Sequence, residues 1–290
     1  MTDPTPTPRR STTADGERMS RRQFLALALV AALGGGALTG VGAAYRFEVV
    51  VQHARLAHLR SPLRLAWLSD LHYGPFIGSG SLSAWVTASN RVAPDVVLLG
   101  GDLVDRAAPN ALEPLFEQLA RLRAPLGVFA VLGNHDHMRF RRGAGLADTL
   151  QLVDALQQAG VRVLHNEGLA LRDDLYLAGI DDFREGRPDL RAALAGRPRS
   201  SACVLLSHNP DVLPLVPTDV ELTLCGHTHG GQVRLPFIGP IVTSSWHGRR
   251  FDMGWVAGPA RGYVTRGLGV TTLPLRIACP AELTVLDLTA

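Results

Sequence analysis

The sequence predicts an α/β protein with a four-layer αββα sandwich, in which two mixed β-sheets pack face to face and helices flank them. In the first half of the chain, short apolar runs alternate with segments of helical periodicity. In the second half, short strand-like runs follow one another with tight turns between them. At 290 residues and 46% hydrophobic content, the chain can form one large core that holds both halves.

Three apolar runs in the first half predict strands, and each is followed by a predicted helix. The strands are Leu63–Leu68, Val96–Leu99 and Val128–Leu132, and the helices are Ser81–Val92, Ala111–Leu122 and Leu146–Ala159. Val96–Leu99 is entirely apolar and lies between Pro94 and Gly100, which is typical of a strand buried on both faces. Because strand–helix–strand crossovers are right-handed, this half predicts a parallel sheet.

After Gly160 the chain changes to short strands joined by turns, which predict a second, mixed sheet. These strands are Val161–Leu164, Leu169–Arg172, Leu175–Ile180, Val204–Ser207, Leu222–Cys225, Tyr263–Thr265 and Leu283–Leu288. We expect both sheets to direct their loops to one edge, where ligands bind in open α/β sheets.

The charge and the cysteines exclude several classes of protein. The net charge is only +3, and no basic stripe interleaved with aromatic residues is present, so specific nucleic-acid binding is not expected. The three cysteines, Cys203, Cys225 and Cys279, show no close pairing in the sequence. They predict neither a disulfide scaffold nor a zinc ribbon, and we expect them to be buried thiols.

The N-terminal region has the composition of a leader rather than of a folded domain. Residues 1–20 are rich in Thr, Pro, Ser and charge, which predicts disorder. Residues 21–44 begin with Arg21-Arg22 and continue as an uncharged apolar stretch, which resembles a twin-arginine export signal. The alternative is a membrane anchor with its positive residues on the cytoplasmic side. We expect export by the twin-arginine machinery to the outer face of the cytoplasmic membrane or the extracytoplasmic space, with the leader either cleaved or retained.

Five short polar motifs follow apolar runs along the chain. They are Asp70-Leu71-His72, Gly101-Asp102-Leu103-Val104-Asp105, Gly133-Asn134-His135-Asp136, Ser207-His208-Asn209 and Gly226-His227-Thr228-His229. Carboxylate and amide oxygens and imidazoles at the ends of several strands are suitable ligands for a pair of divalent metals. Taken singly, most of the motifs are equally compatible with a solvated loop, a helix cap or a turn.

The last motif is the hardest to explain as a structural turn. His227 and His229 stand at alternate positions and are framed by glycines, so on an extended segment both imidazoles point the same way. His135 follows a predicted strand closely, where an imidazole can act as an acid or a base. The motifs together therefore predict a metal-dependent catalytic site.

In this order the motifs resemble those of the calcineurin-like metallophosphoesterase superfamily, and in particular a compact bacterial phosphodiesterase subgroup with a twin-arginine or membrane leader. The resemblance covers roughly residues 63–288 and implies a metallophosphoesterase domain over residues 45–290. Gly230-Gly231-Gln232, Tyr263–Gly269 and Leu275-Arg276 fit the same pattern. One departure is His137-Met138, where the subgroup often has an aromatic residue, and it bears on the substrate preference.

The resemblance implies two metal ions, of Mn, Fe or Zn, and seven ligands for them. Asp70, His72, Asp102 and His229 would hold one ion, while Asp102, Asn134, His208 and His227 would hold the other. A hydroxide that bridges the two ions would attack the phosphorus of a phosphodiester. His135 would then protonate the leaving oxygen, and Asp105 would orient its imidazole.

The sequence leaves the substrate open. The alternative to a simple phosphodiester is a lipid-linked pyrophosphate or a phospholipid, hydrolysed at the same site. Met138–Arg142 and Trp246–Phe251 combine arginines with aromatic residues, which suits phosphate groups or the headgroups of an anionic membrane surface. Each is also compatible with a solvated basic loop. A binding module without turnover is the alternative class of protein, and the intact set of ligands speaks against it.

Overall fold

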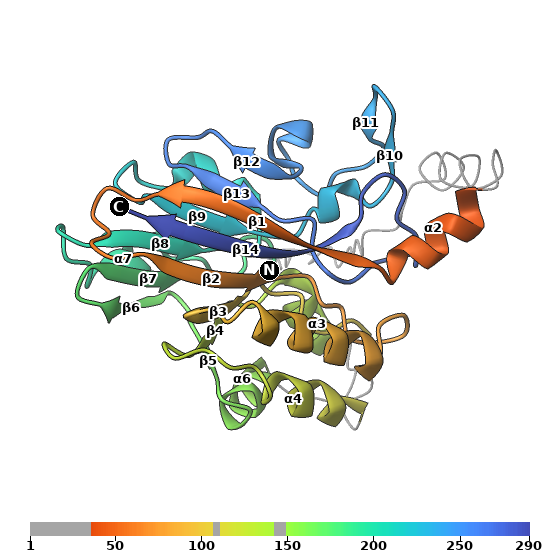
Figure 1. Ribbon diagram of the computed structural model, residues 1–290, viewed down its shortest axis with the longest axis horizontal. Coiled ribbons are helices and arrows are strands. Elements are labelled where there is room, and N and C mark those ends of the chain that lie inside the picture. Colours follow the sequence, from red (N-terminus) through yellow and green to blue (C-terminus); the bar gives the residue numbers. More distant parts are fainter. Residues whose placement is uncertain (1–35, 107–110, 142–148) are drawn as a thin grey trace, which may run out of the picture. The chain divides into compact units, whose positions relative to one another are not determined.

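The computed structural model describes residues 36–106, 111–141 and 149–290, and Leu38–Ala290 form one compact unit (Figure 1). The segment 1–20, predicted to be disordered, and the first part of the predicted leader lie outside the described residues. The last part of the predicted leader forms the helix α2, Gly36–Ala44. Within the described ranges, no helix is long and apolar enough to cross a membrane.

The first sheet has six strands in the order β1-β14-β2-β3-β4-β5. Their bounds are β1 Phe47–Arg55, β14 Ala281–Thr289, β2 Leu63–Leu68, β3 Val96–Leu99, β4 Val128–Ala130 and β5 Val161–Val163. Neighbouring strands are parallel, except for β14 and β2, which are antiparallel. The parallel arrangement predicted for β2, β3 and β4 is therefore confirmed.

The sequence of β2 shows why this strand lies in the centre of the core. Leu65 and Trp67 pack in the cluster between the two sheets, whereas Ala66 and Leu68 pack against the helices on the other face. Successive side chains of a strand point to opposite faces, so a continuous apolar run is buried on both. The residues of β3 alternate between the same two clusters.

The second sheet also has six strands, in the order β12-β13-β9-β8-β7-β6. Their bounds are β6 Glu167–Arg172, β7 Leu175–Gly179, β8 Ala202–Leu206, β9 Leu222–Cys225, β12 Gly254–Val256 and β13 Gly262–Val264. The four inner strands are parallel, and the edge strands β6 and β12 are antiparallel to their neighbours. Leu177 and Leu224 of this sheet share a core with Trp67 and Leu98 of the first. All three cysteines are free and buried, as predicted.

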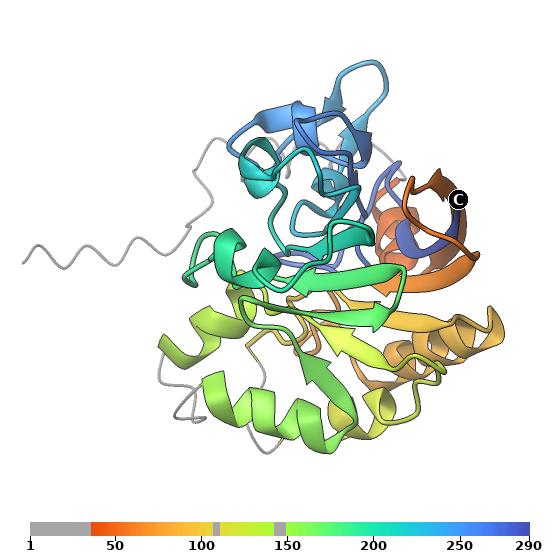
Figure 2. The ribbon, with the colours of Figure 1, turned by 90° about the vertical axis from the view of Figure 1, so that its left-hand side faces the viewer.

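Helices cover the outer faces of both sheets (Figures 1 and 2). On the first sheet these are α3 Ser79–Arg91, α4 Glu113–Leu119 and α6 Thr149–Gln158, whose buried leucines join the core beneath them. On the second sheet the corresponding layer contains α7 Leu190–Leu194 and the 3₁₀ helix η2 Pro210–Leu215. The predicted four-layer αββα sandwich is therefore confirmed.

Two strands predicted for the second sheet belong to the first, so that part of the prediction is wrong. Val161–Leu164 corresponds to β5, which pairs with β4. Leu283–Leu288 lies within β14, which runs between β1 and β2. The sequence does not predict β1 at all, because most of its side chains are at least partly exposed at the sheet edge and lack a regular apolar alternation.

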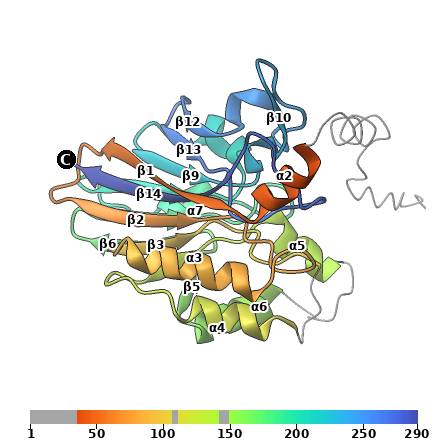
Figure 3. The same ribbon diagram turned by 45° about the vertical axis from the view of Figure 1, so that its right-hand side comes forward.

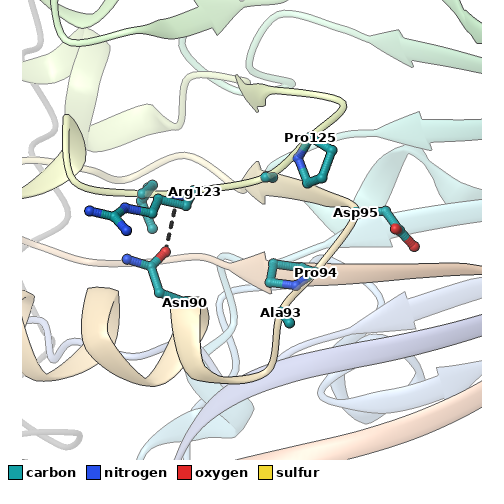
Figure 4. A pocket seen from close by; sticks show the side chains of 8 residues that line it. Asn90, Ala93, Pro94, Asp95, Arg123 and Pro125 are labelled. Carbon is teal, nitrogen blue, oxygen red and sulfur yellow. Dashed lines mark hydrogen bonds between the residues drawn. The ribbon is translucent and has the colours of Figure 1, made fainter.

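A shallow hollow lies at the amino ends of β3 and β4, at the opposite edge from the polar motifs (Figure 4). The side chain of Asn90 donates to the carbonyl of Arg121 at 2.8 Å and accepts the N–H of Arg123 at 2.9 Å. The carboxylate of Asp95 accepts the N–H of Arg64 at 2.7 Å. These polar groups hold the turns of the sheet together, so we assign the hollow a structural role.

Candidate metal centre

The seven candidate ligands follow the carboxyl ends of three parallel strands of the first sheet, β2, β3 and β4, and two of the second, β8 and β9. Asn134 begins the helix α5, Asn134–Arg141, His229 begins the 3₁₀ helix η3, His229–Gly231, and the other ligands lie in loops. Parallel strands end at the same edge of their sheet, so these loops meet. All seven side chains are buried, namely Asp70, His72, Asp102, Asn134, His208, His227 and His229. A buried concentration of carboxylates and imidazoles is costly unless the groups pair or bind a metal.

The first group contains Asp70, His72 and His229, which the structure brings together from β2 and β9. Nε2 of His72 lies 3.0 Å from Nε2 of His229, and Nε2 of His229 lies 3.4 Å from Oδ1 of Asp70. One potential ligand atom from each residue lies within 4.8 Å of the others. Three donors that converge in this way can hold one metal ion.

The second group contains Asp102, His208 and His227. Nε2 of His208 lies 3.2 Å from Oδ2 of Asp102 and 3.2 Å from Nδ1 of His227. The other ring nitrogen of His208, Nδ1, lies 2.7 Å from the carbonyl oxygen of Gly100. A carbonyl can only accept, so this contact places the proton on Nδ1 and leaves Nε2 for a metal.

Asp102 lies between the two groups. Its Oδ2 is 3.2 Å from Nε2 of His208 in the second group and 3.5 Å from Nε2 of His72 in the first. Its Oδ1 accepts the backbone N–H of His135 at 2.8 Å, which holds the carboxylate in place. A carboxylate in contact with both groups can serve both at once.

The donors of the centre fit divalent metal ions. Asp70 Oδ2 and Asn134 Oδ1 are buried and have no hydrogen-bond partner among the described residues. A buried polar atom without a partner is rare and costs free energy, so each of these atoms is suited to bind a cation. Mixed oxygen and imidazole donors suit Mn, Fe and Zn.

Five of the seven candidate ligands have a left-handed backbone conformation. The φ angles are 57° at Asp70, 48° at His72, 50° at Asp102, 70° at His227 and 53° at His229. Each such residue costs about 1–3 kcal/mol and persists only where the surrounding structure imposes it. The strain is therefore concentrated at the candidate ligands, which is where functional residues are expected.

Asp136 is a supporting residue that the sequence analysis did not single out. Its carboxylate accepts the backbone N–H groups of Leu103, Val104 and Gly133 at 2.9, 3.1 and 2.9 Å. It thereby joins the loop after β3, which carries Asp102, to the loop after β4. Its position in the Gly133–Asp136 motif was the only sequence signal for this role.

Arg276 is a second supporting residue, and it is almost completely buried. Its guanidinium donates to the carbonyls of Arg266, Gly267 and Gly269, and Nη2 lies 3.4 Å from Nδ1 of His229. Burial lowers the pKa of Arg276 to about 10. The contact with His229 links the segment before β14 to the first group of candidate ligands.

His135 and Asp105 form a pair beside the first group, with Nδ1 of His135 3.2 Å from Oδ1 of Asp105. Burial disfavours the charged imidazole, but Asp102 and Asp105 outweigh this effect and raise the pKa of His135 to about 9. The His135 side chain is 24% exposed, whereas Asp105 is buried. His135, Asp105 and His72 could also hold a cation together, but a protonated His135 with Nδ1 on Asp105 fits a proton donor better than a ligand.

The other imidazoles differ in charge. Burial, followed by the effect of His135, lowers the pKa of His72 to about 3, so this ring is neutral and ready to bind a metal. Burial also disfavours the charged form of His208, but Asp102 outweighs it and raises the pKa to about 10. His208 must therefore lose a proton before Nε2 can bind a cation.

Of the two segments that combine arginines with aromatic residues, the structure describes the side chains of one. The other begins within the helix α5, Asn134–Arg141, and not in a loop. The side chains of Met138–Arg142 lie outside the described residues. In the loop Trp246–Phe251, the backbone N–H of Trp246 donates to the buried carboxylate of Asp211 at 3.0 Å. The guanidinium of Arg184, which the sequence analysis did not single out, lies 5.4 Å from the centre of a Trp246 ring.

The fold and the grouping of these residues define the class of the protein. The calcineurin-like phosphoesterase family model matches residues 63–231, which include all seven candidate ligands, and the chain belongs to this family. The protein is therefore a metal-dependent phosphoesterase, as the sequence predicted.

Three relatives illustrate the match. YkuE, an uncharacterized metallophosphoesterase of Bacillus subtilis (strain 168), is 34% identical and covers 94% of this chain and 98% of its own. Phosphodiesterase YaeI of Escherichia coli (strain K12) is 32% identical, over 83% of this chain and 88% of its own. A transmembrane protein with a metallophosphoesterase domain from Danio rerio is 32% identical over 82% of this chain. This chain spans only 55% of the Danio rerio protein.

Proposed function

We propose that the protein is a binuclear phosphodiesterase that uses two metal ions at this centre. Asp70, His72 and His229 would hold one ion, Asn134, His208 and His227 the other, and Asp102 would serve both. The observation that carries this proposal is the position of Asp102 Oδ2, within 3.5 Å of an imidazole nitrogen of each group. When bound, such ions polarise the phosphoryl group and lower the pKa of a coordinated water.

The residues of the chain supply orientation and a proton. His135 carries a proton at neutral pH because Asp102 and Asp105 raise its pKa to about 9 against the effect of burial. With Nδ1 held by Asp105, its Nε2 is available to donate to the oxygen of the leaving group. Asp105 keeps the ring oriented and charged.

The name of the Escherichia coli relative, Phosphodiesterase YaeI, supports a phosphodiester as the substrate. A lipid-linked pyrophosphate or a phospholipid is a second candidate, because Trp246, Arg249 and Arg250 are all exposed in one loop. The leader sequence supports export by the twin-arginine machinery. Replacing Arg21 and Arg22 by lysine is expected to keep the protein in the cytoplasm, and an unchanged location would contradict this.

Metal content and turnover test the proposal together. We expect about two ions per chain in the wild type by elemental analysis, with hydrolysis of bis-p-nitrophenyl phosphate. Asp102→Ala is expected to lose both ions, whereas Asp70→Asn keeps the ion of the second group. Asp219→Asn, a surface carboxylate paired with Arg197, is the control and keeps both. Equal metal content in the Asp102 and Asp70 variants would contradict a shared carboxylate.

A further inference from the structure

A small hairpin after the metal centre exposes large apolar side chains. It consists of β10 Arg234–Leu235 and β11 Gly239–Pro240, and the residues between them, Pro236, Phe237 and Ile238, form what we call the hairpin tip. Phe237 is fully exposed, and Ile238 is 53% exposed. Figures 1 and 3 show the hairpin at the rim of the molecule, beyond the second sheet.

The fold itself does not account for the aromatic residue at this tip. Phe237 has a φ of 65°, a left-handed conformation in which glycine or asparagine is much less strained than a bulky side chain. The ring also gains no burial within the chain. A residue that costs free energy in its backbone and recovers none by packing indicates a contact with another surface.

An exposed arginine lies against the hairpin. A Cβ built on Gly239 of β11 would lie 3.9 Å from Nε and Nη1 of Arg249, so this guanidinium lies against the hairpin. Arg249, Arg250 and Trp246 are exposed in the loop that follows. By contrast, Arg234 of β10 is neutralised by Asp252 at 2.8 Å. One exposed arginine beside an apolar tip, with a second in the same loop, complements an anionic lipid surface.

The hairpin is joined to the place where the leader enters the fold. Arg234 donates its N–H to the carbonyl of Ile277, and the neighbouring Arg276 donates its N–H to the carbonyl of Gly40 in α2. Val41 of α2 and Leu273 are exposed as well, by 43% and 37%. The sequence before α2 is uncharged from residue 23 onward, so its insertion into a bilayer would bring this end of the fold to the membrane surface.

We propose that the hairpin tip inserts into the interface of an anionic bilayer, with Arg249 and Arg250 on the phosphate headgroups. The hairpin follows the metal centre directly, since the guanidinium of Arg234 donates to the carbonyl of Gly230 at 2.8 Å, next to His229. Docking would therefore hold the centre near the headgroups. The docking itself does not depend on the chemistry of the metal centre. Its consequence, that the centre acts on phosphodiesters at the membrane surface, rests on the proposed function.

A fluorescent label on the tip tests the insertion directly. The three native cysteines are buried, so Ile238→Cys in the full chain offers one accessible thiol for a polarity-sensitive dye. On vesicles of phosphatidylglycerol and phosphatidylcholine, we expect a blue shift and quenching by lipids brominated in the upper acyl chain. Ala57→Cys, exposed in the β1–β2 turn at the far end of the molecule, is the matched control and stays in water (Figure 1).

Charge and apolar variants separate the two parts of the contact. Phe237→Ser in the labelled chain is expected to lower the inserted fraction about tenfold or more. Arg249→Glu with Arg250→Glu should lower it similarly on anionic vesicles and make it insensitive to the phosphatidylglycerol content. A label that stays in water on vesicle-bound protein overturns the proposal. A blue shift that needs only a higher protein concentration also overturns it, since it would identify a second copy of the chain as the partner.

Turnover of a soluble diester distinguishes failure of docking from failure of the proposed function. Phe237→Ser should hydrolyse bis-p-nitrophenyl phosphate at the wild-type rate, and should lose about tenfold on a diester presented in vesicles. Equal rates of the two proteins on the vesicle substrate refute the role of docking and leave the metal chemistry intact. A wild-type protein without turnover on either substrate refutes the proposed function, while the dye still reports on docking.

Discussion

Replacing His135 by alanine should slow hydrolysis according to how basic the leaving oxygen is. Nδ1 of His135 lies 3.2 Å from Asp105, and the pKa of the ring is raised to about 9 by Asp102 and Asp105 against burial, so the ring is protonated at neutral pH. An alkoxide must take up a proton as it leaves, whereas a p-nitrophenolate leaves readily without one. The variant is therefore expected to be defective only with the first kind of substrate.

The magnitude follows from the value of a positioned proton donor, which is typically about 10²–10⁴-fold in rate. We expect a loss of kcat/KM in this range on glycerophosphocholine and less than about tenfold on bis-p-nitrophenyl phosphate. Steady-state kinetics with both substrates, together with elemental analysis, measure this. Metal content should stay near the wild-type level, because Nδ1 of His135 is held by Asp105.

His58→Ala is the matched control, since His58 forms a similar imidazole–carboxylate pair with Glu221 at 2.8 Å, in the turn after β1. It should leave both rates within about twofold of the wild type, as surface changes away from a site usually do. A His135→Ala enzyme with the full rate on the alkyl diester would refute the assignment. An equal loss on both substrates would point to a role in binding rather than in proton transfer.

Three further predictions concern stability and metal affinity. In the metal-free protein, nearby carboxylates raise the pKa values of His208 and His135 from 6.5 to about 10 and 9, against the effect of burial. The stability that the two charged rings contribute is therefore complete below pH 6.5 and is lost as the pH rises through the folded-state pKa values. Urea unfolding from about pH 6 to 10 measures this loss in the free energy of unfolding. Arg276→Met removes the donor that serves four backbone carbonyls, and it should lower the free energy of unfolding by about 3 kcal/mol or more. A loss below about 1 kcal/mol would mean that water replaces the guanidinium. Gly226→Ala would push a methyl group into the carboxylate of Asp70. It should weaken metal binding about 10- to 100-fold, as measured by competition with a chelator. An unchanged affinity would show that the loop can shift to make room.

The parts of the fold that could be predicted are those set by local pattern. The continuous apolar run of β3 between Pro94 and Gly100 is sufficient to predict a strand buried on both faces. The pairing of β14 depends instead on a distant segment, because it runs between β1 and β2 and joins the two ends of the domain. An apolar run indicates that a strand is buried without indicating which sheet it joins, so the sequence predicts the wrong sheet for β5 and β14.

The candidate ligands could be predicted because their residue types are unusual in loops that follow apolar strands. The supporting residues could not, since their role depends on contacts across the fold. Asp136 acts through three backbone N–H groups from two loops, and Arg276 acts through carbonyls of a segment near β13. An aspartate in a turn or an arginine near a strand has no distinctive sequence pattern.

At five ligand positions the left-handed backbone lowers the stability of the fold, while the side chain there is a donor that the metal centre needs. Glycine at any of these positions would relax about 1 kcal/mol or more of strain, and it would also remove a donor from the metal centre. Comparing glycine with alanine at His72 isolates the two effects, because both lose the imidazole and only glycine relieves the backbone. In the metal-free protein, relief of backbone strain at any of these five positions therefore comes with the loss of a donor that the metal centre uses.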